Sequence, residues 1–347
     1  MVWGRDMVTT QGVYDEALDR FHATGPEFEG WLSNHGPMVV EALARRGSGE
    51  LVHRWTDSYL DRLDDAPVAR FRIGAQDWHH DFGNAVLLGE WREFFRAEVA
   101  EHGWQATVAT WWPRLLPGIA SGATHGVIRL GHALRAIRDE ETEPRRTEVA
   151  HALGYWAARW EPVTIVRPSG RRPVGEVVEG LPGIPDQRFG IRYRLRQQAD
   201  LPDLATQLAS AAGPAGPDEV TGALETLVGA AVAAYSRLAH GNPTMLVHAV
   251  TAPNAVRLAL PSLPRALWLD AYAAAWTATA AVVSAYRPQS PRPVTSSSET
   301  PEQMWERVVE NGGEHIVKLA DTVLDACRAD STGQAVSAVD VAISLDA

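Results

Sequence analysis

A single lysine stands out among the residues that could do chemistry in this chain. The sequence contains 31 arginines and one lysine, Lys318, which follows His315 by three residues in the stretch GGEHIVKLADTV. Residues three apart lie on one face of a helix, so the amine and the imidazole can act on the same point. Three interpretations remain open for Lys318: a solvated surface charge, a buried base or Schiff-base former, or an amine that takes up carbon dioxide to become an anionic carbamate.

Five histidines lie in apolar stretches where an imidazole needs a partner, and these are His35, His125, His132, His248 and His315. Neutral imidazole is a common protein ligand for iron, zinc and copper. A core histidine bonded to a carbonyl group is the alternative for each one taken singly. As a set with Lys318, they predict a metal site whose ligands come from distant parts of the chain.

The spacing of two of these histidines limits how the site can be built. His125 and His132 are seven residues apart, which is two turns and about 10.5 Å of rise on a regular helix. Both can bind one ion only if the helix starts late or the ligand approaches from its end. One of the pair is therefore expected to support a ligand or to face the substrate, and we take His132 as the candidate catalytic residue.

Other catalytic signatures are missing from the sequence. It contains no Gly-x-Gly-x-x-Gly fingerprint, no phosphate-binding loop and no Gly-x-Ser-x-Gly elbow. Nucleotide binding and serine hydrolysis are therefore weak interpretations. The 13 tryptophans could line a pocket for a flat aromatic molecule, although tryptophans more often fill a core.

Composition indicates a globular protein with an acidic surface. The 347 residues are 45% hydrophobic and 22% charged, with a formal net charge of −11. This charge disfavours binding to nucleic acid, because no excess of cations is present to neutralise phosphates. One cysteine, Cys327, excludes an internal disulfide and a zinc site made of several thiolates. We also expect no signal peptide and no membrane-spanning helix, and a cytoplasmic location.

Hydrophobic periodicity predicts a mainly α fold, as one large helical domain over residues 1–347 with a central cavity lined by histidines. Helices are expected to begin at Asn34, at Thr124 and at Thr300, where Thr300 and Gln303 have the spacing of a capping box. Further helices are expected to cover residues 84–100, 147–159, 218–239, 265–286 and about 314–328. Residues 161–200 are rich in Pro, Gly and Arg, and the alternation from Phe189 to Leu195 indicates an irregular loop or a small β excursion. Residues 287–299 are expected to form a connector.

Six ordered stretches of the chain resemble those of the questin oxidase-like family. They are YDEALDRF, EFEGWLSNHGPMVVEAL, WREFFRAEV, LLPGIASGATHGVIRLGHALRAI, LVHAVTAPNAVRL and GGEHIVKLADTVLDAC, and they extend from Tyr14 to Cys327. Members of that family are oxygen-using enzymes that open or oxidise anthraquinone-type rings in aromatic polyketide pathways. At least one member uses non-haem iron held by four histidines and a carboxylated lysine. The resemblance thus implies Lys318 and four of the five histidines as ligands.

The resemblance implies an oxidoreductase, a mono- or dioxygenase that uses Fe(II) or another first-row metal, a carbamate on Lys318, molecular oxygen and a small aromatic substrate. A metal-free Baeyer–Villiger oxidase assisted by NADPH is the alternative among enzymes, with a partner reductase as another source of electrons. A non-catalytic protein that binds an aromatic metabolite is the alternative outside enzymes. The substrate and the oligomeric state do not follow from the sequence.

Overall fold

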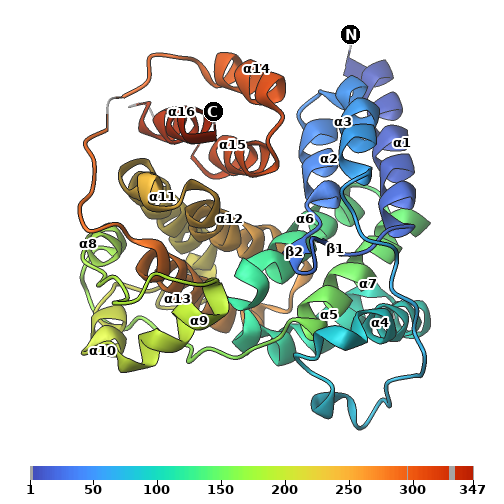
Figure 1. Ribbon diagram of the computed structural model, residues 1–347, viewed down its shortest axis with the longest axis horizontal. Helices are drawn as coiled ribbons and strands as arrows, with labels where there is room; N and C mark the ends of the chain where they lie inside the picture. Colours follow the sequence, from blue (N-terminus) through green and yellow to red (C-terminus); the bar gives the residue numbers. More distant parts are fainter. Residues whose placement is uncertain (1–2, 295, 328–332, 347) are drawn as a thin grey trace. The chain divides into compact units, whose positions relative to one another are not determined.

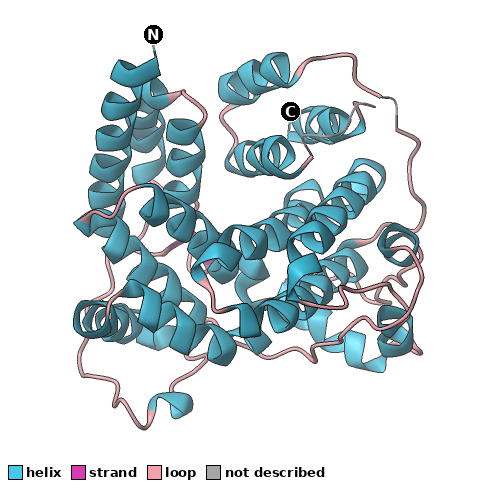
Figure 2. Ribbon diagram, turned by 180° about the vertical axis from the view of Figure 1, so that it is seen from behind, coloured by secondary structure: helices cyan, strands magenta, loops and turns pink. Residues whose placement is uncertain are grey.

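The computed structural model describes residues 3–294, 296–327 and 333–346 and confirms a mainly α fold (Figures 1 and 2). In the described residues the only sheet is a two-stranded antiparallel one made of β1 (Glu27–Phe28) and β2 (Leu32–Ser33). The chain divides into two compact units. Unit 1 comprises Met1–Leu115 and His125–Glu161, and unit 2 comprises Leu116–Thr124 and Pro162–Ala347. The interpretation of the chain as one domain stays a prediction.

Unit 1 is a packed set of seven α-helices within its described residues. These are α1 (Trp3–His22), α2 (Gly36–Arg45), α3 (Val52–Leu60), α4 (Leu88–His102), α5 (Trp104–Leu115), α6 (His125–Asp139) and α7 (Glu143–Ala158), with short 3-10 turns η1 (Gly49–Leu51), η2 (Trp78–His80) and η3 (Ala85–Leu87). Figure 1 shows α1, α2 and α3 side by side, and α7 packs against both α4 and α6. Helices α6 and α7 are almost completely buried, so they form the core of the unit.

Unit 2 is built around three long apolar helices, α11 (Val220–Leu238), α12 (Pro243–Ala259) and α13 (Trp268–Tyr286), which pack against one another. The other helices are α8 (Val174–Glu179), α9 (Ile191–Arg196), α10 (Leu204–Ala209), α14 (Pro301–Asn311), α15 (Glu314–Ala326) and α16 (Gln334–Asp346). Its 3-10 turns are η4 (Leu116–Gly118), η5 (Ser121–Thr124), η6 (Gln197–Asp200), η7 (Pro217–Glu219), η8 (Ala239–Gly241), η9 (Leu260–Ser262) and η10 (Arg265–Leu267). Helix α15 packs on α12, which brings two predicted site segments of unit 2 together.

Residues 161–200, predicted as an irregular loop or a small β excursion, are irregular over much of their length. The alternation from Phe189 to Leu195 does not form a strand: the chain forms helix α9 there, and α8 precedes it. A run of seven residues is too short for its periodicity to separate a helix from a strand. Tertiary contacts favour the helix here, because the guanidinium of Arg194 donates to the carbonyl of Ala285 at 2.9 Å and lies 4.3 Å from the ring centre of Tyr286.

The start of α14 confirms a capping box. The hydroxyl of Thr300 accepts from the backbone N–H of Gln303, and the side chain of Gln303 accepts from the backbone N–H of Thr300. The helix ends at Gly312, whose φ of 72° is a left-handed conformation that glycine adopts at low cost. Between α13 and α14, the described residues of the predicted connector 287–299 form neither helix nor strand.

One helical segment in the described residues, Arg265–Tyr286, is long and apolar enough to cross a membrane. Most of it is buried inside the protein, and α13 packs on α12, α11 and α9 within unit 2. This burial is that of a core helix.

Candidate functional site

Unit 1 brings two of the predicted ligands into direct contact. His35 directly precedes α2 and His125 is the first residue of α6, and both side chains are buried. Their Nε2 atoms lie 2.7 Å apart and their rings stack with centres at 4.7 Å. Two ring nitrogens at that distance share one proton, since two N–H groups would repel each other. The pair can offer lone pairs to a cation that replaces this proton.

A glycine after each of these histidines explains how they are positioned. A Cβ atom on Gly36 would lie 2.4 Å from the ring of Phe21, and one on Gly126 would lie 2.6 Å from the side chain of Trp156. Only a residue without a side chain allows α2 and α6 to begin so close to these aromatic rings. The glycines after His35 and His125 therefore allow close packing at the starts of α2 and α6.

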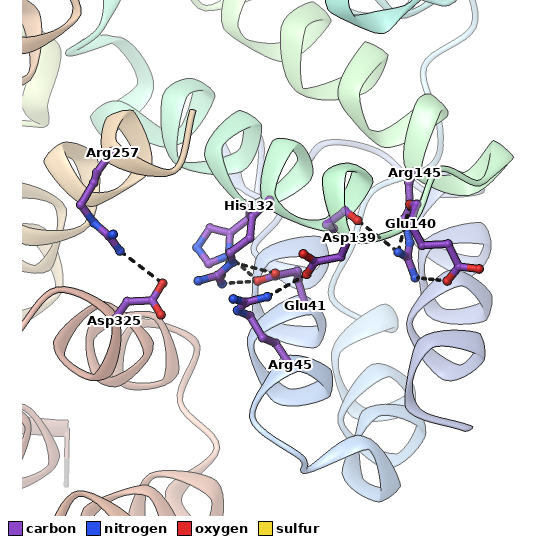
Figure 3. Close-up of polar contacts among 10 residues, drawn as sticks. Glu41, Arg45, His132, Asp139, Glu140, Arg145, Arg257 and Asp325 are labelled. Atoms are coloured by element: carbon purple, nitrogen blue, oxygen red, sulfur yellow. Dashed lines mark hydrogen bonds and ion pairs between the residues drawn. The ribbon is translucent and has the colours of Figure 1, made fainter. Parts of the chain in front are cut away.

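His132 does not share the contact of His35 and His125, and it belongs to a buried ionic network. Its Nδ1 donates to the carboxylate of Glu41 at 2.9 Å, and Arg135 donates to the other carboxylate oxygen at 2.8 Å (Figure 3). Burial alone would raise the pKa of Glu41, but Arg135 and His132 overcome this effect and lower it to about 2. The ionised carboxylate fixes the tautomer of His132, which leaves Nε2 able to accept a proton or bind an ion.

Lys318 is the most unusual residue of unit 2. Its side chain is 0% exposed, and its Nζ has no hydrogen-bond partner among the described residues. Burial lowers the pKa of this amine to about 7, although Glu314 one turn earlier opposes the effect. The interpretation of Lys318 as a surface charge is therefore wrong. A buried donor without a hydrogen-bond partner lowers the free energy of unfolding by about 1–3 kcal/mol. Lys318 at this position therefore does not stabilise the fold.

Two predicted histidines accompany Lys318 in unit 2. His315 lies one turn before it on α15, and the rings of His248 on α12 and His315 meet edge to face with centres 5.2 Å apart. The Nδ1 of His248 donates to the carbonyl of Met245 at 3.1 Å, which leaves its Nε2 with a lone pair. Burial, and secondarily the charge of Lys318, lowers the pKa of His248 to about 3, so this imidazole stays neutral.

Two polar contacts fix α12 against α15 and thereby the register of these residues. The guanidinium of Arg257 lies 3.5 Å from the carboxylate of Asp325 (Figure 3), and Asn254 donates to the hydroxyl of Thr322 at 3.3 Å. Both contacts lie within the α12 and α15 pair that carries His248 and Lys318. They hold the imidazole and the amine on facing helices.

The donor set fits a metal ion in its chemistry. The predicted residues form a histidine pair in unit 1, a separate carboxylate-supported histidine in unit 1, and a group of two histidines and an unpartnered amine in unit 2. Neutral imidazoles suit iron, zinc and copper, whereas an ammonium repels a cation. Lys318 therefore fits such an ion only as a neutral amine or as a carbamate.

Several of the 13 tryptophans belong to the core. Trp111, Trp112 and Trp156 are at most 1% exposed and pack against other aromatic rings of unit 1. They fill the interior and do not form an open wall. Sequence reasoning missed Glu41 and Arg135, because nothing in a linear sequence shows that residue 41 meets residues 132 and 135.

No protein-family model matches the chain, and a search of curated proteins finds no match. The functional argument therefore depends on the residues themselves.

Proposed function

We propose that the protein is a cytoplasmic, non-haem metal-dependent oxygenase of the questin oxidase-like kind, acting on an anthraquinone- or hydroquinone-type aromatic polyketide with molecular oxygen. The observation that carries the proposal is the fully buried Nζ of Lys318, which has no hydrogen-bond partner in the part of the chain that the structure describes and lies one helical turn from His315. Iron is the first metal to test, and other first-row ions share its affinity for imidazole.

A carbamate gives this buried amine a use that arginine cannot provide. The neutral nitrogen attacks the carbon of CO2, a C–N bond forms, and the nitrogen releases one proton to solvent or a nearby base. The product is an anion with two oxygen atoms on a long side chain. Such an anion offsets the charge of a metal ion and removes the unpaired donor from the interior.

The candidate metal ligands of the proposal are His248, His315 and carboxylated Lys318 in unit 2 and the pair His35 and His125 in unit 1, with His132 of unit 1 as ligand or proton acceptor. When bound, the ion would supply the activation of oxygen. His248 can present Nε2 because the carbonyl of Met245 holds its other nitrogen. His132 can accept a proton from a substrate hydroxyl at Nε2, because Glu41 stabilises the resulting imidazolium.

Metal analysis of protein produced in iron-supplemented cells tests the proposal. We expect close to one iron per chain, lost in Lys318→Met and in Lys318→Arg, with thermal unfolding still cooperative in both. His53→Ala, which removes a half-exposed imidazole of unit 1, is the control and keeps the metal. Protein grown with 13C-labelled bicarbonate should show a carbamate carbon signal by NMR that both Lys318 variants lack.

Substitution in each unit then tests which histidines bind the metal. His248→Ala should remove the iron while leaving circular dichroism unchanged, and His35→Ala tests separately whether the histidine pair of unit 1 holds an ion. A metal-free protein that oxidises an anthraquinone with NADPH would support the Baeyer–Villiger alternative. Tight binding of the aromatic compound without turnover, in protein that never takes up metal, would support a binding protein.

A further inference from the structure

A second group of potential ligands lies within unit 1 and takes no part in the proposed function. His22 is the last residue of α1, while Glu148 and His151 lie three residues apart on α7. One ligand atom from each of these three side chains lies within 4.8 Å of the others. We name these residues the His22 cluster.

The carboxylate of the His22 cluster is held in place on one side. Arg129 on α6 donates to both oxygens of Glu148 at 2.6 and 2.7 Å, and His22 lies 3.0 Å from one of them. Glu148 is 1% exposed, so these contacts fix its orientation. A carboxylate accepts up to about four hydrogen bonds or ligand bonds, and lone pairs therefore remain for an ion.

His151 is the residue that ionic pairing does not explain. It is 5% exposed, and its Nε2 is buried without a hydrogen-bond partner among the described residues. Its ring meets that of His22 edge to face with centres 4.7 Å apart. It also lines a small cavity, together with Arg92, Arg129 and Tyr155, whose room suits about one water molecule. A polar nitrogen left unpaired beside a cavity indicates a missing partner.

We infer that His22, Glu148 and His151 bind a divalent first-row transition ion, with Zn2+ as the natural occupant. Two imidazoles and one carboxylate are a donor set that Zn2+ accepts with a position left open. Bond lengths of about 2.1 Å allow ligand atoms up to about 4.2 Å apart, so only small side-chain shifts are needed. The adjacent cavity leaves room for a water ligand. Glu-x-x-His spacing on one helix places a carboxylate and an imidazole on a common face.

A small anion is the alternative occupant of the cavity, because Arg92 and Arg129 lie beside the His22 cluster. Arg129 is neutralised by Glu148, and the guanidinium of Arg92 donates to the carbonyls of His22 and Thr24 at the end of α1. A helix C-terminus carries partial negative charge, so Arg92 is also compensated. Because the charges of Arg92 and Arg129 are both compensated, neither arginine requires an anion. The Nε2 of His151 is the atom that lacks a partner among the described residues, and a neutral imidazole binds a metal ion more readily than an anion.

Variants that retain the fold test this inference independently of the proposed function. All are prepared in the Lys318→Met background and stripped with a chelator, and Zn2+ and Co2+ are then titrated by calorimetry. His151→Phe keeps the ring and removes both nitrogens, and His22→Gln keeps a side chain that can donate to Glu148. His102→Ala is the control, since His102 is half exposed and has Glu98 one turn away, and within the described residues it belongs to no group of three potential ligands.

One equivalent of Zn2+ should bind, with an affinity more than roughly 100-fold weaker in His151→Phe and His22→Gln and unchanged in His102→Ala. Arg92→Gln removes a nearby positive charge and should tighten Zn2+ binding several-fold. Co2+ should give an absorption band in the visible that His151→Phe lacks. Zn2+ binding that is equal in wild-type His151 and in His151→Phe overturns the inference. Stabilisation by chloride or phosphate that Arg92→Gln abolishes would assign the cavity to an anion instead.

Discussion

Unit 1 and unit 2 each bury an ionisable side chain, but only the one in unit 1 has hydrogen-bond partners among the described residues. In unit 1, Glu41 meets Arg135 and His132, so each ionic group has partners. In unit 2, the Nζ of Lys318 is equally buried and has no hydrogen-bond partner among the described residues. A paired network holds helices in register, whereas an unpaired buried base lowers stability unless another species completes it. The comparison therefore separates residues that maintain the fold from residues kept for chemistry.

Breaking the paired network should give the largest effect. Arg135→Met leaves Glu41 buried with His132 alone, and we expect the free energy of unfolding to fall by about 3–5 kcal/mol, measured by urea denaturation. Asp139→Asn breaks the contact of Asp139 with Arg45, which joins the same two helices on the surface (Figure 3). In this control variant the free energy of unfolding should fall by at most about 1 kcal/mol. Equal losses in both variants would show that burial of the network does not matter.

Acid should weaken unit 1 through its carboxylates. Burial opposes ionisation of Glu148, but Arg129 and His22 outweigh it and lower its pKa to about 2. A carboxyl group whose pKa is lower in the folded state contributes stability above its unfolded pKa, and this contribution is lost as the pH falls towards 2. We expect a loss of about 3 kcal/mol from Glu148 between pH 5 and pH 2, measured from urea unfolding at each pH. A flat profile over this range would contradict the pairing.

Lys318 should show the opposite behaviour in metal-free protein. Its folded pKa of about 7 lies below its unfolded value, so the unfolded chain binds more protons between pH 7 and pH 10. Stability should therefore rise with pH over that range, by up to about 1.4 kcal/mol per unit. Lys318→Met should remove this rise with pH and increase the free energy of unfolding at pH 7 by about 1–3 kcal/mol. The comparison needs CO2-depleted buffer and chemical denaturation, and a less stable Lys318→Met protein would show that the amine has a partner.

Glycine substitutions in the two units should give the smallest changes in the free energy of unfolding. Gly36→Ala in unit 1 places a methyl group against the ring of Phe21 and should lower the free energy of unfolding by about 1–3 kcal/mol. Gly229→Ala in α11 of unit 2 meets nothing within 4 Å and should raise it by about 0.5–1 kcal/mol. Thermal unfolding of both variants checks the two signs. If Gly36→Ala is neutral, close packing is not what positions His35.

Particular residues show where sequence reasoning succeeded. The capping box at Thr300 is local chemistry among four residues, and the structure has it as predicted. The pair formed by His315 and Lys318 follows from helical periodicity alone. The small β excursion considered for Phe189 to Leu195 does not form, because so short an alternation fits α9 equally well, and a contact of Arg194 with the carbonyl of a residue 91 positions away favours the helix.

The sequence by itself determined the mainly α class, most long helices, and the histidines and single lysine that could do chemistry. Helical periodicity and capping depend on residues close together in the chain, and composition needs no structure, so a single sequence predicts them. Tertiary structure alone decided that Lys318 is buried with no hydrogen-bond partner in the described ranges, that Glu41 supports His132, and that His22 meets Glu148 across 126 positions. Burial and pairing arise when distant segments pack together, and no local pattern encodes which segments those are.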